Sequence, residues 1–218
     1  AAGQPVLVAI EYTPAMAGEL SPQAAMLLSQ LAANGSPVLF TSQYAAGTAV
    51  ASQFTVANDD QMVGYLPGEG VGLRQLGDCL AARNDCAQLN GRQLSTELQT
   101  SLSQTGLVIV LTGDRDNLVN WIEQVGTVAT GVPLVAGVTQ ALTPLANSYA
   151  AASQLNGLLG GTPDAVAYEQ LVTQPETNLN SFLNAQIYAQ LLVGILLLIG
   201  LITYTTRGWL AHRQQGNA

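Results

Sequence analysis

The sequence predicts an α/β domain with a parallel sheet, followed by one C-terminal transmembrane helix. Short apolar runs alternate with helical patterns over residues 1–172, as in a parallel sheet with helices on both faces. The run LVIVLT at 107–112 is apolar on both faces, as a central parallel strand should be. An uncharged run between Glu176 and Arg207 contains the apolar stretch 187–206. The sheet is expected to have about five strands in a Rossmann-like or flavodoxin-like arrangement.

The expected strands are separated by recognisable helix starts and ends. They cover 6–12, 38–42, 61–66, 107–112 and 133–138, and 155–159 is a candidate short edge strand. Ser21 and Pro22 are expected to be the N-cap and first residue of the first helix, which Asn34 and Gly35 end.

Later elements follow the same logic. Asp114 is expected to cap the helix after 107–112, and Thr96 with Gln99 to cap a short helix before it. The remaining expectations are a small-residue helix at about 46–56, a helix after Pro67, an irregular excursion at 83–93, and helix starts at Thr143–Pro144 and Thr162–Pro163.

The chain is expected to cross the membrane once. Its predicted segments are an extracytoplasmic domain at 1–172, a polar juxtamembrane stalk at 173–186, a transmembrane helix at 187–206 and a cytoplasmic tail at 207–218. As an α-helix, residues 187–204 rise about 27 Å, close to the hydrocarbon thickness of about 30 Å. Arg207 and Arg213 in the acid-free tail predict that the tail is cytoplasmic and the domain outside the cytoplasmic membrane.

The amino terminus and the cysteines fit export. The sequence begins AAGQP without Met, so a cleaved signal peptide is expected, with a disordered amino-terminal helix as the alternative. Cys79 and Cys86 are the two cysteines, and outside the cytoplasm a disulfide is expected between them. A free buried pair is the alternative.

Composition limits the classes of partner. Charged residues make up 9% of the chain, the formal net charge is −8, and lysine is absent. Binding of nucleic acid requires clustered cations, so no nucleic-acid partner is expected. The expected partners are the lipid bilayer and other subunits of a membrane complex.

Candidate ligand-binding residues lie where strands should end. They are Glu11, Ser42, Glu69, Asp114 and Asp116. Glu11, Asp114 and Asp116 could hold a divalent cation such as Mg²⁺, but a helix cap explains Asp114 and a favourable helix dipole explains Asp116, so no metal site is expected.

The glycine-rich turn at 64–72, GYLPGEGVG, does not fit a cofactor motif. Leu73 stands where a dinucleotide fingerprint requires glycine or alanine, and a P-loop requires a lysine. The turn is therefore expected to serve tight backbone geometry, and no cofactor is predicted.

Catalytic residues are not expected in the domain. The single histidine, His212, follows the predicted span, so a Ser-His or Cys-His pair cannot form before it. Ligation of haem, zinc or an iron–sulfur cluster lacks the necessary His and Cys.

Several segments together carry a resemblance. They are VLVAIEYTP, GELSPQA, GYLPGEGVGLRQLG, WIEQVGT and GVPLVAGV, followed by the terminal span. This combination resembles a family of uncharacterised, single-pass bacterial membrane proteins with an exported Rossmann-like domain. The resemblance implies the architecture and carries no catalytic motif.

The leading functional expectation is a non-catalytic accessory or scaffold subunit of a bacterial membrane complex. Gly194 and Gly200 would admit close contact with neighbouring helices, which makes the helix faces around them the expected docking surface. One alternative is a membrane-anchored, extracytoplasmic small-molecule binding domain. A second alternative is an enzyme with a carboxylate-based site.

Overall fold

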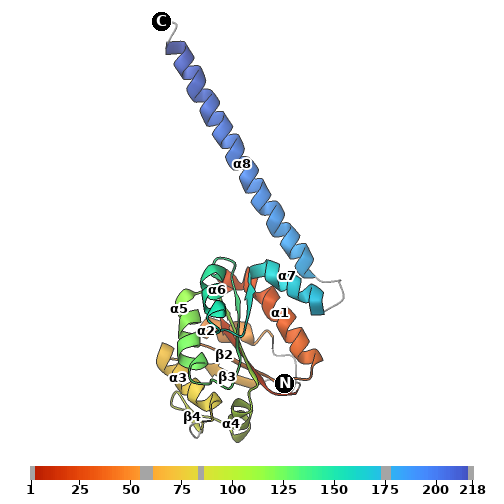
Figure 1. Cartoon of the computed structure of the whole chain (residues 1–218), viewed down its shortest axis with the longest axis vertical. Helices are drawn as coiled ribbons and strands as arrows, with labels where there is room; N and C mark the ends of the chain where they lie inside the picture. The colour runs from red at the N-terminus through yellow and green to blue at the C-terminus, as the bar shows by residue number, and fades with distance from the viewer. Residues whose placement is uncertain (1–2, 55–60, 83–85, 173–177, 216–218) are drawn as a thin grey trace. The chain divides into compact units, whose positions relative to one another are not determined.

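The computed structural model describes residues 3–54, 61–82, 86–172 and 178–215. The chain divides into two compact units, Ala1–Thr173 and Gln174–Ala218. The first unit is an α/β domain, and the described part of the second is one long helix, α8 (Asn178–Gln215). Figure 1 labels several elements of the first unit and α8 of the second.

The α/β domain is built on a parallel sheet, as the sequence predicts. The six strands are β1 (Val6–Glu11), β2 (Val38–Ser42), β3 (Gln61–Tyr65), β6 (Leu107–Thr112), β7 (Leu134–Val138) and β8 (Gly157–Gly160). Their order is β3-β2-β1-β6-β7-β8, and every neighbouring pair is parallel. The sheet has one strand more than expected because the segment considered for the edge forms β8, which pairs with β7. The chain order reverses between β1 and β6, the position where open α/β sheets bind ligands.

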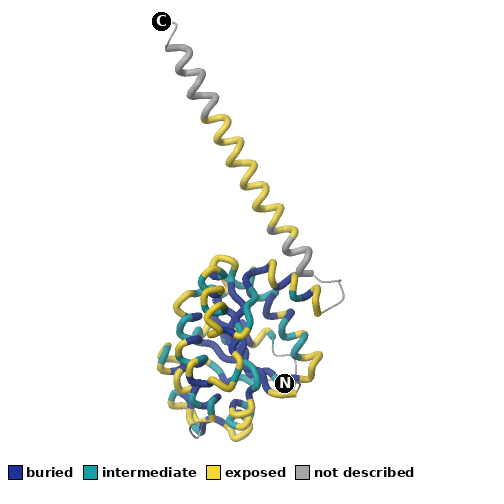
Figure 2. The backbone as a smooth tube through the Cα atoms, viewed as in Figure 1, coloured by how far each residue is buried: buried dark blue, intermediate teal, exposed yellow. Residues whose placement is uncertain are grey.

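Helices cover both faces of the sheet. One core contains residues of α1 (Ala17–Ala33) and α2 (Ala45–Ala51), and α7 (Gly161–Val172) packs against α1. The other core contains residues of α3 (Glu69–Leu80), α4 (Thr96–Ser103), α5 (Arg115–Asn120), the π-helical segment η2 (Trp121–Gly126) and α6 (Thr143–Ala151). Figure 2 shows buried chain at the centre and exposed chain on the outer helices.

Alternation along β1 determines which core each side chain enters. Val6, Val8 and Ile10 belong to the core with α1 and α2. Leu7 and Ala9 belong to the opposite core. Because successive side chains of a strand point to opposite faces, the next residue on the side of Leu7 and Ala9 is Glu11. A carboxyl group is thereby directed into an apolar core.

The start of α1 differs from the prediction. The helix begins at Ala17, after a short 3₁₀ turn η1 (Pro14–Met16), so Ser21 is not its N-cap. Leu20 is fully buried, which favours a helical turn before Pro22, and the Ser21 hydroxyl instead lies 3.1 Å from Tyr12 Oη. The C-cap is Asn34, as predicted.

The other helix starts agree with the prediction only in part. Asp114 caps α5 as predicted, accepting a hydrogen bond from the Asn117 amide at 3.0 Å. In α4 the N-cap is Ser95 rather than Thr96, because the Ser95 hydroxyl accepts from Leu98 N at 3.2 Å. Thr143 begins α6, whose N-cap is Leu142, and Thr162 lies within α7.

The segment expected to be irregular contains a small antiparallel hairpin, β4 (Gln88–Leu89) and β5 (Arg92–Gln93). A disulfide joins Cys79 at the end of α3 to Cys86 before the hairpin. Arg92 reaches the edge of the main sheet, where its Nη1 donates to the Val63 carbonyl oxygen at 3.1 Å. The helix predicted for about 46–56 is α2, which ends earlier, at Ala51. Residues 55–60 and 83–85 lie outside the described residues.

The second unit supports the predicted membrane span. Within α8, Ile187–Tyr204 is long and apolar enough to cross a membrane. Residues 173–177 of the predicted stalk lie outside the described residues, and from Asn178 the chain is helical. Gly194 and Gly200 lie on this helix, and a Cβ atom at either would meet no atom within 4 Å in the described structure.

Candidate functional site

A pocket of about 360 Å³ lies at the carboxyl ends of the strands. It is lined by the last residue of β3 and by residues that follow β2, β3 and β6. The lining residues are Gln43, Tyr44, Tyr65, Leu66, Gly68, Glu69, Asp114, Asp116, Asn117 and Asn120. Loops that follow parallel strands meet at this edge of the sheet, beside the reversal of strand order. The fold therefore places the pocket where α/β domains bind ligands.

Glu11 lies at the end of β1, completely buried next to the residues that form the pocket. The backbone amide of Gln43 is 3.0 Å from both carboxyl oxygens. The indole Nε1 of Trp121 donates to Oε1 at 3.0 Å. The carboxyl group thus joins the loop after β2 to the helical layer after β6.

Burial has the largest effect on the pKa of this carboxyl group. It raises the pKa of Glu11 from 4.5 to about 7, because removing the group from water disfavours its charged form. The hydrogen bonds from Gln43 and Trp121 oppose this shift without cancelling it. Glu11 therefore changes charge near neutral pH.

Trp121 is the largest fully buried side chain in the described domain. It begins the π-helical segment, in which the Thr127 amide bonds to the carbonyl of Ile122, five residues earlier. Such single-turn widenings of an α-helix occur frequently at functional sites. Here the turn follows α5, whose first residues border the pocket.

The loop after β2 is fixed by Ser42. Its hydroxyl donates to the Ile10 carbonyl oxygen at 2.6 Å and accepts from the Tyr44 amide at 3.0 Å. At Gly47, a Cβ atom would overlap both the Ser42 hydroxyl and the Ile10 carbonyl oxygen. Close backbone approach therefore requires glycine here, and the result is a fixed position for Gln43 and Tyr44.

The glycine-rich turn supplies another wall of the pocket through tight backbone geometry. Gly68 has φ +87°, and a Cβ atom at Gly72 would overlap the Pro67 carbonyl oxygen. Glu69 itself has φ +45°, a left-handed conformation that is unfavourable for a residue with a side chain. The turn holds Glu69 at the pocket at the start of α3.

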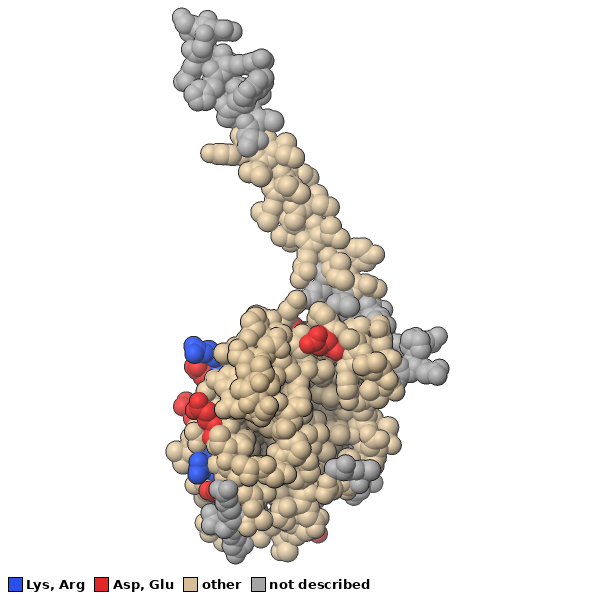
Figure 3. Space-filling model, viewed as in Figure 1, with Lys and Arg blue, Asp and Glu red and all other residues tan. Residues whose placement is uncertain are grey.

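The pocket carries negative charge. Its described acidic lining residues are Glu69, Asp114 and Asp116, and its described lining includes no Lys, Arg or His. Burial raises the pKa of the Tyr44 phenol, and the charge of Asp114 raises it further. In Figure 3 most of the charged side chains in view lie along one edge of the domain, over α3 and α5, an acidic patch lies apart from them, and the rest of that face is mostly uncharged.

Two amide side chains complete the lining. Asn117 Nδ2 donates to Tyr44 Oη at 2.7 Å, which orients the phenol from the α5 side. The Gln43 side chain has both Oε1 and Nε2 buried without a hydrogen-bond partner among the described residues. Since leaving a buried polar atom unpaired costs about 1–3 kcal/mol, a bound polar ligand would relieve a cost already present.

The structure separates the predicted site residues into two layers. Glu69, Asp114 and Asp116 line the pocket, whereas the buried Glu11 and Ser42 support its walls. The sequence analysis missed the lining residues Gln43, Tyr44, Tyr65 and Asn117 and the supporting Trp121. Their position in the sequence was the usable signal, because each ends or follows β2, β3 or β6 at the carboxyl edge of the sheet. Within the described residues, no three His, Cys, Asp or Glu side chains are grouped closely enough to hold a metal ion.

No protein-family model matches the chain, and no curated protein is similar to it in sequence.

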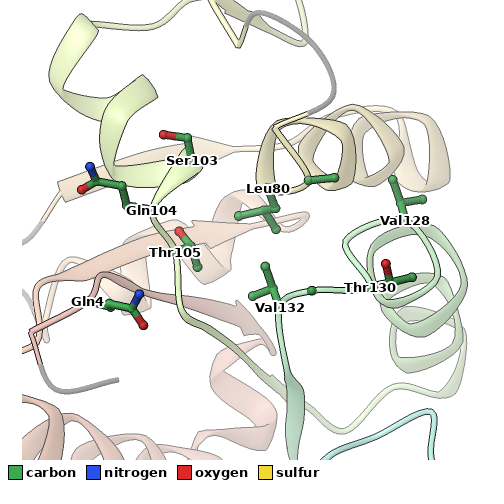
Figure 4. Close-up of a pocket in the computed structure, with 10 residues that line it drawn as sticks. Gln4, Leu80, Ser103, Gln104, Thr105, Val128, Thr130 and Val132 are labelled. Carbon is green, nitrogen blue, oxygen red and sulfur yellow. The ribbon is translucent and has the colours of Figure 1, made fainter.

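A different cavity, of about 370 Å³, lies at the amino ends of the strands. Figure 4 shows Leu80 and Val132 facing one another there, with Gln4 to one side and Thr130 to the other. Its described lining residues are uncharged. The cavity is on the opposite edge from the acidic pocket and lacks its combination of charge and unpartnered amide groups.

Proposed function

We propose that this chain is a membrane-anchored binding protein that holds a small organic cation, such as an amine, in the acidic pocket of its α/β domain. The observation that carries the proposal is the pocket at the carboxyl edge, which combines three acids with two tyrosines and an unpartnered amide. A site at this edge, lined by a few convergent polar groups, is the usual form of a small-molecule site in an α/β fold.

The chemistry of the lining selects the class of ligand. Glu69, Asp114 and Asp116 would repel an anion and attract a cation. Tyr44 and Tyr65 offer aromatic faces, which attract organic ammonium groups. The Gln43 side chain would supply a hydrogen-bond acceptor and a donor to the polar part of the same ligand.

Isothermal titration of the full chain in nanodiscs of zwitterionic lipid tests the pocket. Choline, putrescine and arginine serve as probes, and at least one is expected to bind saturably, more weakly as salt rises. The double variant Glu69→Gln/Asp116→Asn should weaken binding at least about fivefold, because an exposed ion pair contributes up to about 1 kcal/mol.

The matched control is Glu97→Gln, which removes an exposed acid from the first turn of α4. This variant should bind like the wild type. Absence of heat with every probe, or equal weakening by Glu97→Gln, would contradict a cation site in this pocket.

The proposed location is the cytoplasmic membrane, with the domain outside and the tail inside. The apolar α8 supports anchoring, and Arg207 with Arg213 supports the orientation. The Cys79–Cys86 disulfide also fits an oxidising compartment.

A second proposed role is that of an accessory subunit of a membrane complex, which docks through α8. The supporting observation is that Gly194 and Gly200 interrupt the exposed apolar surface of the span with positions that lack side chains. Small residues let helix backbones approach closely in lipid. The binding role and the accessory role are compatible in one chain.

Gly194→Leu and Gly200→Leu test docking. If the span packs against partner helices at these positions, each variant should lower the yield of partners that co-purify in mild detergent by severalfold. Leu198→Ile is the control, because it replaces one apolar side chain with another at an exposed position of the same helix. If all variants co-purified with the same yield of partners, docking through these glycines would be contradicted and α8 would serve only as an anchor.

A further inference from the structure

A cavity of about 500 Å³ is lined by residues of α1, α7 and the strands β6, β7 and β8. Figure 1 shows α1 and α7 as neighbouring helices of the domain. Leu27 and Leu31 of α1 line it on one side. Leu107, Val135 and Leu159 line it from the strands. This volume lies in the range of small-molecule sites, about 300–1,000 Å³.

The cavity is apolar and open to the surface. Leu31, Leu107 and Val135 are all partly exposed, although they pack against the core. Gly157 adds no side chain at the β8 end, where a Cβ atom would lie 3.1 Å from Val135 Cγ1. Its described lining contains no charged residue. An occupant would therefore be stabilised by burying hydrocarbon against this lining.

One polar atom in this apolar lining lacks a partner. Gln30 lines the cavity, and its Nε2 is buried without a hydrogen-bond partner among the described residues. An amide donor in this state favours an occupant with an oxygen acceptor next to its hydrocarbon. The combination differs from the acidic pocket, which offers charge and aromatic faces.

We propose that this cavity binds the hydrocarbon tail of a single-chain lipid amphiphile, with Gln30 Nε2 donating to an acid or ester oxygen of the lipid. The inference rests on the proposed membrane anchoring, because α8 tethers the domain to a bilayer where lipids are concentrated. A second copy of the chain fits less well, since a stable protein interface requires about 800 Å² from each partner, whereas a cavity of this size accommodates a small molecule.

Photolabelling of the full chain in liposomes tests the proposal. The probe is a trace fatty acid with a diazirine near its methyl end, and labelled peptic peptides are identified by mass spectrometry. Labels are expected in α8, which reports membrane insertion, and separately in α1 and β7–β8, which report the cavity. Leu31→Trp, which fills the cavity, should reduce the second set at least about fivefold and leave the α8 labels unchanged.

Controls distinguish the cavity from nonspecific contact. Ala25→Trp adds the same side chain at an exposed position of α1 and should label like the wild type. Leu27→Trp is a second filling variant if Leu31→Trp does not fold, as judged by circular dichroism. Gln30→Leu should keep the hydrocarbon site but weaken competition by unlabelled palmitate about threefold.

The outcomes separate the two proposals. Labels in α8 without labels in α1 and β7–β8, or cavity labels that Leu31→Trp and Leu27→Trp leave unchanged, would overturn the lipid site and retain the anchor. Absence of labels from α8 would overturn the anchoring itself. Crosslinks between two copies through α1 would assign the cavity to a protein contact and likewise overturn the lipid site.

Discussion

Raising the pH from 4.5 to 8 should destabilise the wild-type domain by about 3 kcal/mol relative to the Glu11→Gln variant. Burial raises the pKa of Glu11 from 4.5 to about 7, so the folded state favours the protonated form. The contribution of Glu11 to stability is therefore complete below pH 4.5 and is lost as the pH rises through about 7. Other carboxyl groups titrate in both proteins, so the difference isolates Glu11.

Urea unfolding of the full chain in micelles measures this difference, with the fluorescence of Trp121 as the signal in a Trp209→Phe background. Glu97→Gln removes an exposed carboxyl group and is the matched control. Its pH dependence should follow the wild type. The raised pKa of Glu11 would be contradicted if the free energies of unfolding of Glu11→Gln and the wild type changed in parallel from pH 4.5 to 8.

Trp121→Phe should destabilise the domain by about 3 kcal/mol at pH 8 and by about 1–2 kcal/mol less at pH 5. The variant leaves a cavity at both pH values, because Trp121 is fully buried. It also removes the indole donor, 3.0 Å from Glu11 Oε1, and this bond is stronger when the carboxyl group is charged. Loss of the bond should raise the pKa of Glu11 further.

Circular dichroism detects unfolding after the tryptophan is removed, and a double-mutant cycle with Glu11→Gln isolates the pair. In the Glu11→Gln background, Trp121→Phe should have the same cost at pH 5 and pH 8. A cost that is equal at both pH values in the wild-type background would show that Trp121 acts through packing alone.

Local sequence patterns predicted much of the domain. The strand LVIVLT needs no information beyond its own residues, and β6 has the predicted bounds. Asp114 caps α5 through an amide three residues away, so its role is also local. Ser21 misled the prediction because the signal before Pro22 is local, whereas the burial of Leu20 depends on the tertiary core.

The candidate site was harder to predict because its contacts join distant segments. Glu11 and Trp121 are 110 residues apart, and Tyr44 and Asn117 are 73 apart. The general position at the strand ends could be predicted from the α/β pattern, which located Glu69, Asp114 and Asp116. Which side chains point into the pocket depends on register, on the alternation along β1 and on the π-helical turn. None of these is set by a short stretch of sequence.

The bond between Arg92 and the Val63 carbonyl has a consequence for solubility. Val63 belongs to β3, an edge strand, and exposed strand edges are templates for pairing with other chains. The register shift between β2 and β3 lies at the same place, beside Gly64 with φ +99°. A guanidinium on the carbonyl and an irregular backbone both oppose edge-to-edge pairing. If α8 anchors the chain as proposed, copies of the protein would meet at high local density in the bilayer, and a blocked edge would then oppose their aggregation.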